Sequence, residues 1–291
     1  MMRLRDSLFG WALMAPTLLI LGVFVIYPAF SSFYLSLHDF DAFMTTKTFV
    51  GFDNYRLLFI SPEYWQSIWV SVGFTLLTVV PSVVLSLFFA VALDGNPYFR
   101  GLLRTIFLMP VAVSSAMAAM LWVFIYNPSS GYLNYLLELI GISGPNWLSD
   151  PSWALIAVSV ATIWKEIGFN IIFFLAGLAS IPSDLREAAL IDGANPMQTF
   201  FYVTLPMLSP TIFFVSVVSV INAFQSFGQI YILTAGGPAG ATNTLVYNLY
   251  RDAFRNFQTG SASAQAIILF FIMLIVTMIQ FRFARKRVHY S

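Results

Sequence analysis

The amino-acid sequence predicts an all-α membrane protein with six transmembrane helices and a polar insert between the fourth and fifth helices. The first observation is composition, because 59% of the 291 residues are hydrophobic and 9% are charged, whereas soluble domains carry about 25% charged residues. The second is a series of six apolar segments long enough to cross a bilayer. The third is the stretch 181–206, which places four charged residues between two of these segments.

The apolar segments define a single transmembrane domain that covers residues 1–291. They run from about 8 to 37, 67 to 93, 102 to 126, 153 to 179, 207 to 233 and 262 to 283. Only helices and closed barrels satisfy the backbone in lipid, and these segments lack the period of two expected of barrel strands. The first segment exceeds the apolar core of a signal peptide, about 7–15 residues, so it is expected to remain as a membrane helix.

Lysine and arginine are distributed unequally between the two sides of the predicted bundle. With the N-terminus inside, nine basic residues lie on the cytoplasmic side and four on the outer side. The nine are Arg3, Arg5, Arg100, Arg104, Arg186, Arg282, Arg285, Lys286 and Arg287, and the four are Lys47, Arg56, Arg251 and Arg255. Because cytoplasmic loops carry the excess of basic residues, both termini are expected in the cytoplasm.

Several kinds of chemistry find no support in the sequence. The net charge of +1 gives no electrostatic basis for binding nucleic acid. The chain has no cysteine and two histidines, so no metal site is expected. It contains no Gly-x-x-x-x-Gly-Lys-Ser/Thr pattern for a nucleotide and no His-Glu-x-x-His pattern for a metalloenzyme. The chain is therefore expected to be no enzyme and to hold no cofactor or metal of its own.

The polar insert carries the start and stop signals of two short helices. The run Pro182-Ser-Asp184 is typical of a helix start, where a short polar side chain accepts from the first-turn amides. Gly193 is expected to end this helix. Asn195-Pro196 with Gln198 predicts a second start, with asparagine as the cap and glutamine completing a capping box. On these grounds alone the insert is either an amphipathic loop on the membrane or a docking element for a partner.

The spacing within the insert resembles the EAA motif of bacterial ABC-importer permeases. That motif consists of Glu-Ala-Ala, then Gly, then Ile-x-Leu-Pro. The corresponding residues here are Glu187-Ala188-Ala189, Gly193 and Val203-x-Leu205-Pro206. Val203 in place of isoleucine keeps the apolar character. The position of the motif, between the fourth and fifth of six spans, also matches the family.

Further short matches extend the resemblance over most of the chain. Pro28, Phe52-Asp-Asn-Tyr55, Asn127-Pro128, Trp164-Lys165 and Gly236-Gly-Pro238 are similar to the sugar-type permeases of the maltose-transport class. The stretches 244–254 and 263–282 are most similar to the A-type permease subunit of glycerol-3-phosphate importers.

The resemblance implies the transmembrane fold of a type I ABC importer in the bacterial cytoplasmic (inner) membrane. The implied partners, besides membrane lipid, are a second permease subunit in a heterodimer, two ATPase subunits that carry ATP and magnesium, and an external solute-binding protein. The implied function is ATP-driven import of a small carbohydrate-type solute, such as a sugar, a polyol or glycoside, or glycerol-3-phosphate. The residues implied to couple the chain to the ATPases are Arg186, Glu187, Ala188, Ala189, Asp192, Gly193, Leu205 and Pro206.

Four polar residues recur in the predicted fifth span. Asn222, Gln225, Ser226 and Gln229 have the spacing i, i+3, i+4, i+7, which predicts one face of a single helix. Polar groups are costly in lipid, so this face is expected to meet protein or water. Two interpretations remain open: a translocation pathway whose amides bind substrate hydroxyls, and hydrogen bonding to a neighbouring helix or subunit.

The predicted fourth span carries Lys165 and Glu166, with Asn170 about one turn further along. These three join the candidate substrate pathway. Adjacent helical residues point about 100° apart, so the two charges need not pair with each other. An intramembrane charge is a functional candidate by default, and Lys165 is the natural partner of an anionic substrate. A structural ion pair or hydrogen-bond network between helices is the other interpretation.

A stand-alone secondary transporter or channel is the alternative function. Such a protein usually shows internal repeats and several intramembrane acids. The sequence has no convincing repeat, and Glu166 is the only acid deep within a predicted span.

Overall fold

The computed structural model describes residues 2–40, 46–95 and 97–287. The chain divides into two compact units. The first comprises Met1–Pro62 and Leu249–Phe271, and the second comprises Glu63–Asn248 and Ile272–Ser291. Helices α14 (Leu245–Phe254) and α15 (Thr259–Arg287) contribute residues to both units.

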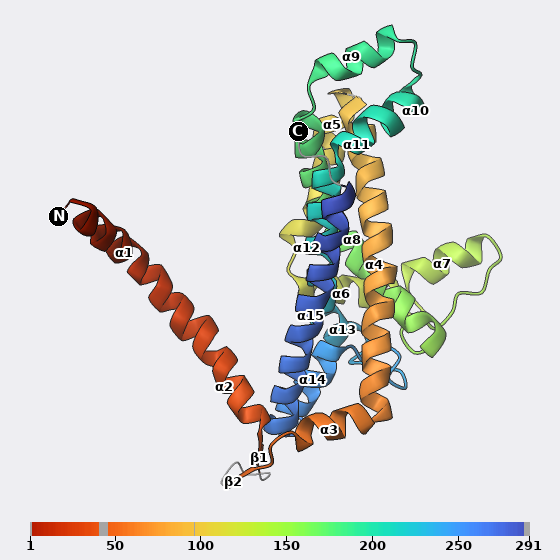
Figure 1. The fold of residues 1–291 in the computed structure, drawn as a ribbon. Coiled ribbons are helices and arrows are strands. Elements are labelled where there is room, and N and C mark those ends of the chain that lie inside the picture. Colours follow the sequence, from red (N-terminus) through yellow and green to blue (C-terminus); the bar gives the residue numbers. More distant parts are fainter. Residues whose placement is uncertain (1, 41–45, 96, 288–291) are drawn as a thin grey trace. The chain divides into compact units, whose positions relative to one another are not determined.

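The first unit begins with a long run of helix (Figure 1). Helix α1 (Met2–Leu21) passes through a π-helical turn, η1 (Gly22–Ile26), into α2 (Tyr27–Ser36). Strands β1 (His38–Phe40) and β2 (Lys47–Phe49) then pair antiparallel. The side-chain amide of Asn54, in α3 (Asp53–Ile60), donates to the carbonyls of Ser36 at 2.8 Å and His38 at 3.0 Å. This side chain ties α3 to the end of α2.

The second unit contains the predicted functional residues. Its helices are α4 (Pro62–Gly95), α5 (Pro97–Ala112), α6 (Ser115–Ile125), α7 (Tyr132–Leu139), α8 (Pro151–Ala179), α9 (Ser183–Ile191), α10 (Pro196–Thr199), the π-helical turn η2 (Phe200–Thr204), α11 (Leu205–Met207), α12 (Ser209–Phe224) and α13 (Gly228–Leu233). Within this unit, α9, α10 and α11 lie together at one end of the long helices (Figure 1).

A buried apolar core joins α4, α8 and the start of α12 near the insert. Its members, each at most 8% exposed, are Ala90, Leu93, Ile167, Ile171, Phe174, Leu178, Ile181, Leu208 and Val215. Burial of such side chains stabilises each by about 1.5–3 kcal/mol relative to exposure. The two points where the chain enters and leaves the insert, at Ile181 and Leu208, are therefore fixed to the long helices.

Helices α5 and α8 approach each other closely at Gly168. A Cβ atom added there would lie 1.9 Å from the carbonyl oxygen of Phe107. No side chain fits in that space, so glycine is required for the two backbones to meet. This contact brings α5 against the part of α8 that carries Lys165 and Glu166.

Four of the predicted spans are confirmed as single helices long and apolar enough to cross a membrane. These are Leu13–Ser36, Pro62–Asp94, Pro151–Ala179 and Thr259–Ala284. The predicted third span, 102–126, is instead two helices, because Thr105–Ala112 and Ser115–Ile125 meet at 111°. Pro110 lacks an amide hydrogen, and the Ser114 hydroxyl accepts from the amide of Met117 at 3.2 Å to cap a new helix.

The prediction of one unbroken helix over 207–233 is wrong. The segment Pro196–Met207 meets Ser209–Phe224 at 65°, and Pro206 and Pro210 remove backbone donors on either side of that bend. Helix α12 then ends at Phe224, and α13 begins at Gly228. A Cβ on Gly228 would lie 3.3 Å from the Cβ of Ser115, so α13 packs closely on α6 rather than continuing α12.

The predicted orientation rests on side chains at the ends of helices. Seven of the nine side chains predicted on the cytoplasmic side are outside the part of the chain that the structure describes: Arg3, Arg5, Arg100, Arg104, Arg285, Lys286 and Arg287. The location of both termini therefore stays a prediction.

Candidate functional site

The insert contains the two short helices that the sequence predicts, but its first cap differs. Helix α9 starts after Pro182, which has extended backbone angles and offers no side-chain acceptor. Ser183 is already helical, and its hydroxyl donates to the Asp184 carboxylate at 3.2 Å. The expectation of a polar side-chain cap over 182–184 is therefore wrong. The φ angle of Pro182, −55°, suits helix and extended backbone alike, and its ψ angle of 133° places it outside the helix.

The end of α9 confirms the predicted role of Gly193. This residue has φ +81°, a left-handed conformation that glycine adopts without a Cβ penalty. The Gly193 amide donates to the Leu190 carbonyl at 3.1 Å, and the Ala194 amide donates to the Ala189 carbonyl at 2.9 Å. This pair of bonds is a Schellman motif, which satisfies the last carbonyls of the helix.

The second start is confirmed as well. The Asn195 side chain accepts from the amide of Gln198, and the Gln198 side chain accepts from the amide of Asn195, both at 2.9 Å. Pro196 occupies the first turn, where a missing amide hydrogen has no cost. These local bonds hold the two short helices in one fixed arrangement at the end of the unit.

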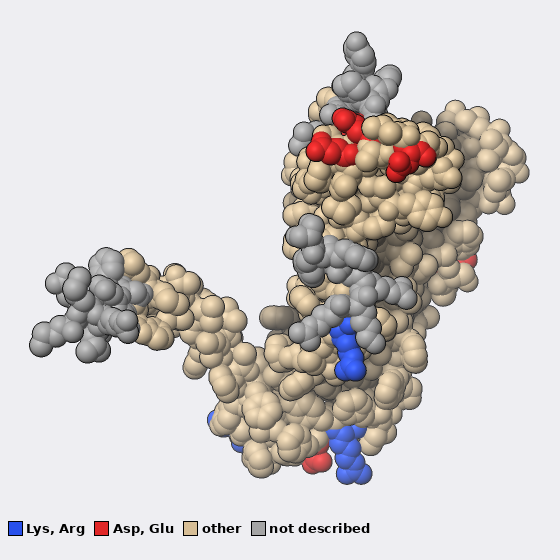
Figure 2. Space-filling model, turned by 45° about the horizontal axis from the view of Figure 1, so that its top comes forward, with Lys and Arg blue, Asp and Glu red and all other residues tan. Residues whose placement is uncertain are grey.

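The residues predicted to couple to the ATPases divide by exposure. Glu187, Ala188, Asp192 and Gly193 are exposed, whereas Arg186, Ala189, Leu205 and Pro206 are partly buried. With Asp184, also exposed, the insert offers three exposed acids. Acidic side chains gather on the face of the second unit shown in Figure 2. Large apolar side chains lie exposed beside them, with Ile191 85% exposed and Leu190 61% exposed. Leu190 and Ile191 are not among the residues that the motif predicts for coupling.

Arg186 points inward. One guanidinium nitrogen, Nη1, lies 2.9 Å from Oδ2 of Asp94, near the end of α4, and Nη2 donates to the Leu178 carbonyl at 3.2 Å. The chain itself therefore engages the polar end of this side chain. The predicted role of Arg186 in coupling to an ATPase subunit stays a prediction, and the structure adds an internal contact to it.

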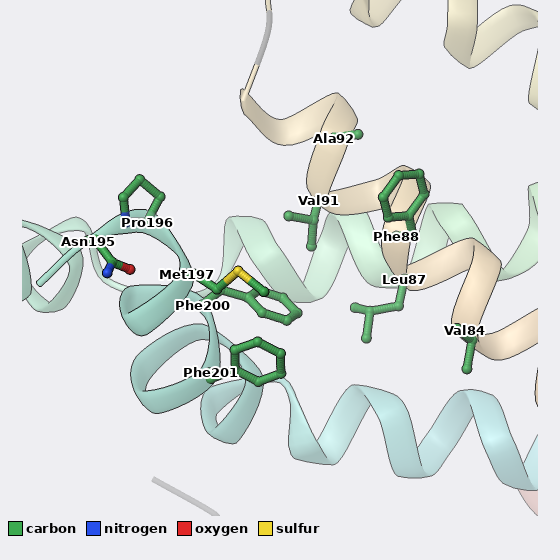
Figure 3. Close-up of a pocket in the computed structure, with 10 residues that line it drawn as sticks. All are labelled: Val84, Leu87, Phe88, Val91, Ala92, Asn195, Pro196, Met197, Phe200 and Phe201. Carbon is green, nitrogen blue, oxygen red and sulfur yellow. The ribbon is translucent and has the colours of Figure 1, made fainter.

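An apolar groove separates the second half of the insert from α4. It has a volume of about 810 Å³ and is lined by Val84, Leu87, Phe88, Val91, Ala92, Asn195, Pro196, Met197, Phe200 and Phe201. The aromatic rings of Phe200 and Phe201 lie across the groove from Leu87 and Val91 (Figure 3). The insert thus contacts α4 through Arg186, whereas from Asn195 onward the groove separates the insert from α4.

A second cavity, of about 450 Å³, lies between α8 and the turn that follows α12. All seven residues predicted for the substrate pathway line it: Lys165, Glu166, Asn170, Asn222, Gln225, Ser226 and Gln229. Val111, Ser115, Phe169, Phe227 and Gly228 complete the lining. The structure thus brings together two groups of residues that are separated by more than fifty positions in the sequence.

The reason these residues converge is not the one predicted. Gln225 is the C-cap of α12, and Gln229 belongs to α13, so the two do not share one helix face. The turn over Gln225–Phe227 folds α13 back onto α6 and leaves the polar side chains around a common space. Ser115 was not predicted because it lies at the start of α6, after a helix break within the predicted third span.

Glu166 gives this cavity its acidic group. Its Oε2 atom is buried and, among the described residues, has no hydrogen-bond partner. An unpaired buried oxygen is costly, which favours a ligand or water as its partner. No group of three or more His, Cys, Asp or Glu side chains in the described ranges could hold a metal ion.

Asn170 is the most buried of the seven predicted pathway residues, at 2% exposed, and its side chain contacts two other helices. Its side-chain nitrogen donates to Ser82 Oγ at 3.0 Å and lies 3.3 Å from Ser219 Oγ. These two serines belong to α4 and α12. Asn170 therefore joins three helices, and hydrogen bonding between helices accounts for its polar side chain.

We expect Asn170 and Asn222 to respond differently to substitution. Asn170→Leu removes the contacts to both serines and leaves buried hydroxyls unpaired, so it is expected to destabilise the protein by about 1–3 kcal/mol. Asn222 is exposed to the cavity, and Asn222→Leu is expected to leave the melting temperature of the purified protein unchanged. Thermal unfolding in detergent measures both, and equal melting temperatures for the two variants would contradict the assignment.

Comparison with known proteins identifies close relatives over the full length. The family model described as "Binding-protein-dependent transport system inner membrane component" matches residues 82–290. The sn-glycerol-3-phosphate transport system permease protein UgpA of Agrobacterium fabrum (strain C58) is 42% identical over 289 residues, which cover 98% of both chains. The protein of the same name from Pectobacterium atrosepticum is 39% identical over 288 residues, covering 99% of this chain and 97% of that protein.

Solved structures share the fold. A chain in the crystal structure of a bacterial ABC transporter involved in the import of the acidic polysaccharide alginate superposes with a TM-score of 0.86 and 24% identity, over 99% of this chain and 98% of that chain. The same type of transporter in complex with an alginate pentasaccharide-bound periplasmic protein gives a TM-score of 0.88 at 23% identity over the same shares. The predicted transmembrane fold is thereby confirmed.

Proposed function

Because this chain belongs to the family of binding-protein-dependent transport system inner membrane components, we propose that it moves its solute by receiving force from separate ATPase subunits. The chain is a transmembrane permease subunit of an ABC importer. The proposed assembly adds a second permease subunit, two ATPase subunits that bind ATP and magnesium, and an external solute-binding protein. Both termini and the insert face the cytoplasm in this assembly, as the distribution of basic residues favours.

The observation that carries this proposal is the geometry of the insert. Two short helices, locked by the Schellman motif at Gly193 and the capping box at Asn195, stand exposed at the end of the unit. Their entry and exit points at Ile181 and Leu208 are buried in the core. A rigid, exposed element anchored in this way transmits a push as a rigid-body movement of the attached helices. Closure of the ATPases on ATP would supply that push.

The proposed solute is sn-glycerol-3-phosphate, the compound named in the relatives' printed names. The cavity between α8 and the turn after α12 suits such a compound chemically. Lys165 supplies a cation for the phosphate, and the amides of Asn222, Gln225 and Gln229 suit the hydroxyls. The pathway is therefore proposed to pass through this cavity.

Substitution of Lys165 tests the role of charge in the cavity. Lys165→Met is expected to lower uptake of sn-glycerol-3-phosphate by about tenfold or more, since a hydrogen bond to a charged group contributes about 1.5–3 kcal/mol. Uptake of a neutral polyol, where the importer accepts one, is expected to change far less. Radiolabelled uptake into proteoliposomes measures both; equal loss for the anionic and neutral solutes would assign Lys165 a structural role instead.

Purification of the intact complex tests the proposed assembly. An ATPase subunit is expected to co-purify with this chain, and the rate of ATP hydrolysis is expected to rise when the loaded solute-binding protein is added. Uptake that proceeds without ATP and without a binding protein would instead support a stand-alone secondary transporter.

A further inference from the structure

Arg186 is the only one of the proposed coupling residues with a side chain that forms an ion pair within the described chain. Its Nη1 atom lies 2.9 Å from Asp94 Oδ2, with 33% and 29% of the two side chains exposed. Nη2 donates to the Leu178 carbonyl at 3.2 Å. One guanidinium on α9 thus contacts both α4 and α8.

Both contacts lie at helix C-termini. Asp94 is the penultimate residue of α4, and Leu178 is the penultimate residue of α8. A helix C-terminus carries a partial negative charge, so an acid such as Asp94 is unfavourable there and a cation is favourable. Arg186 therefore compensates the ends of two long helices and one carboxylate at the same time.

The part of the insert beyond Asn195 does not replace this contact, and Ile181 and Leu208, at the two ends of the insert, share the apolar core with α4. Beyond Asn195, the groove of about 810 Å³ lies between the insert and α4 (Figure 3). Side chains across a groove of this size transmit little force by packing, because dispersion contacts weaken steeply with separation. The ion pair is consequently well placed to make α4 follow a movement of α9.

The opposite end of α4 is tied to a different segment. Ser67 Oγ accepts from the side-chain amide of Asn243 at 3.1 Å, and Ser71 Oγ accepts from the backbone amide of Leu245 at 2.8 Å. All four residues are buried. Ser71 and Asp94 are 23 positions apart on one helix, which corresponds to roughly 35 Å at about 1.5 Å per residue. Helix α4 therefore connects the insert with the loop that precedes α14.

We propose that Arg186 is a positioning residue that couples α4 to the movement of the insert. Helix α4 would then move with the insert as α8 and α12, the two helices attached to it, do. Through the pair with Asp94, movement of α9 reaches α4, and through Ser67 and Ser71 it reaches the loop Thr234–Asn243 at the far end. The inference rests on the proposed function of the insert. It adds a route by which ATP binding on one side of the membrane changes a loop on the other.

The experiment uses the complete importer in proteoliposomes with its own solute-binding protein. The chain contains no cysteine, so a fluorophore attached at Ala239→Cys, an exposed position in the far loop, reports on that loop; the same complex without this cysteine gives the background. Addition of ATP and the loaded binding protein is expected to change the fluorescence. Solute transported per ATP hydrolysed is measured in parallel.

Arg186→Met and Asp94→Ala are each expected to reduce the fluorescence change and the solute transported per ATP by at least about fivefold, the lower end of typical coupling factors, while ATP hydrolysis continues. The exchanged pair Arg186→Asp with Asp94→Arg is expected to restore both. Arg56→Met, which removes an exposed arginine from α3, is the control for loss of one positive charge and is expected to match the unaltered importer.

Fluorescence and transport per ATP within twofold of the unaltered importer for Asp94→Ala would overturn the inference, as would failure of the exchanged pair in an assembled complex. ATP-independent uptake by the unaltered importer would instead overturn the proposed function. The two failures are therefore distinguishable.

Discussion

Gly193→Asp is expected to abolish ATP-driven uptake while the protein still folds and inserts. Gly193 has φ +81° and is exposed, and a Cβ there meets nothing within 4 Å. The cost to folding is therefore the left-handed backbone, about 1–2 kcal/mol. The added carboxylate would stand on the proposed contact surface with the ATPase, beside Asp192, where desolvating an unpaired charge opposes docking. Uptake into vesicles, measured with the amount of chain in the membrane, checks this.

Gly141→Asp is a matched control for that variant. Gly141 has φ +78°, is exposed and meets nothing within 4 Å. It ends α7 with the same motif, since its amide donates to the Glu138 carbonyl and the Ile142 amide donates to the Leu137 carbonyl. The backbone strain is therefore equal, but α7 lies in a segment predicted to face outward. Equal loss of uptake in both variants would attribute the effect to strain rather than to coupling.

Gly168→Ala is expected to destabilise the protein by about 1–3 kcal/mol, the usual cost of overpacking, although alanine is the better helix former. Its Cβ would lie 1.9 Å from the Phe107 carbonyl oxygen. Because backbone cannot rotate away as a side chain can, α5 and α8 would have to separate. Their separation would also disturb the cavity beside Lys165 and lower transport.

Gly73→Ala is the matched control on α4. Its Cβ would lie 3.7 Å from Leu155 Cδ2, an ordinary van der Waals contact. The variant is expected to be neutral or to stabilise the protein by up to about 1 kcal/mol through helix propensity. Melting temperatures in detergent compare the two, and a Gly168→Ala protein as stable as Gly73→Ala would contradict the close approach of α5 and α8.

Local signals in the sequence predicted local features well. Gly193 as a left-handed helix end, and Asn195, Pro196 and Gln198 as a capped start, depend on bonds between neighbours within a few residues. The one local error, a polar cap before α9, arose because Ser183 and Pro182 are both acceptable at helix starts. Which of them lies outside the helix is decided by how the chain leaves α8.

The breaks within predicted spans could not be read in the same way. Apolar residues lie on both sides of Ser114 and of Gln225. This pattern is compatible with one continuous helix and equally with two short helices. The close packing of α13 on α6 at Gly228 decides for two helices. Consequently Gln225 and Gln229 line one cavity, as predicted, but they do not share one helix, which was the predicted reason.

By itself, the sequence determined that the chain is an all-α membrane protein with a capped, motif-bearing insert, because apolar length, capping residues and motif spacing are properties of contiguous residues. Tertiary structure alone decided where side chains from distant segments meet. It turned Arg186 inward to Asp94, used Asn170 to join three helices and gathered seven polar residues around one cavity. The physical reason is that an unpaired polar group is costly in a membrane bundle, so its partner is fixed by which helices pack together and not by its neighbours in sequence.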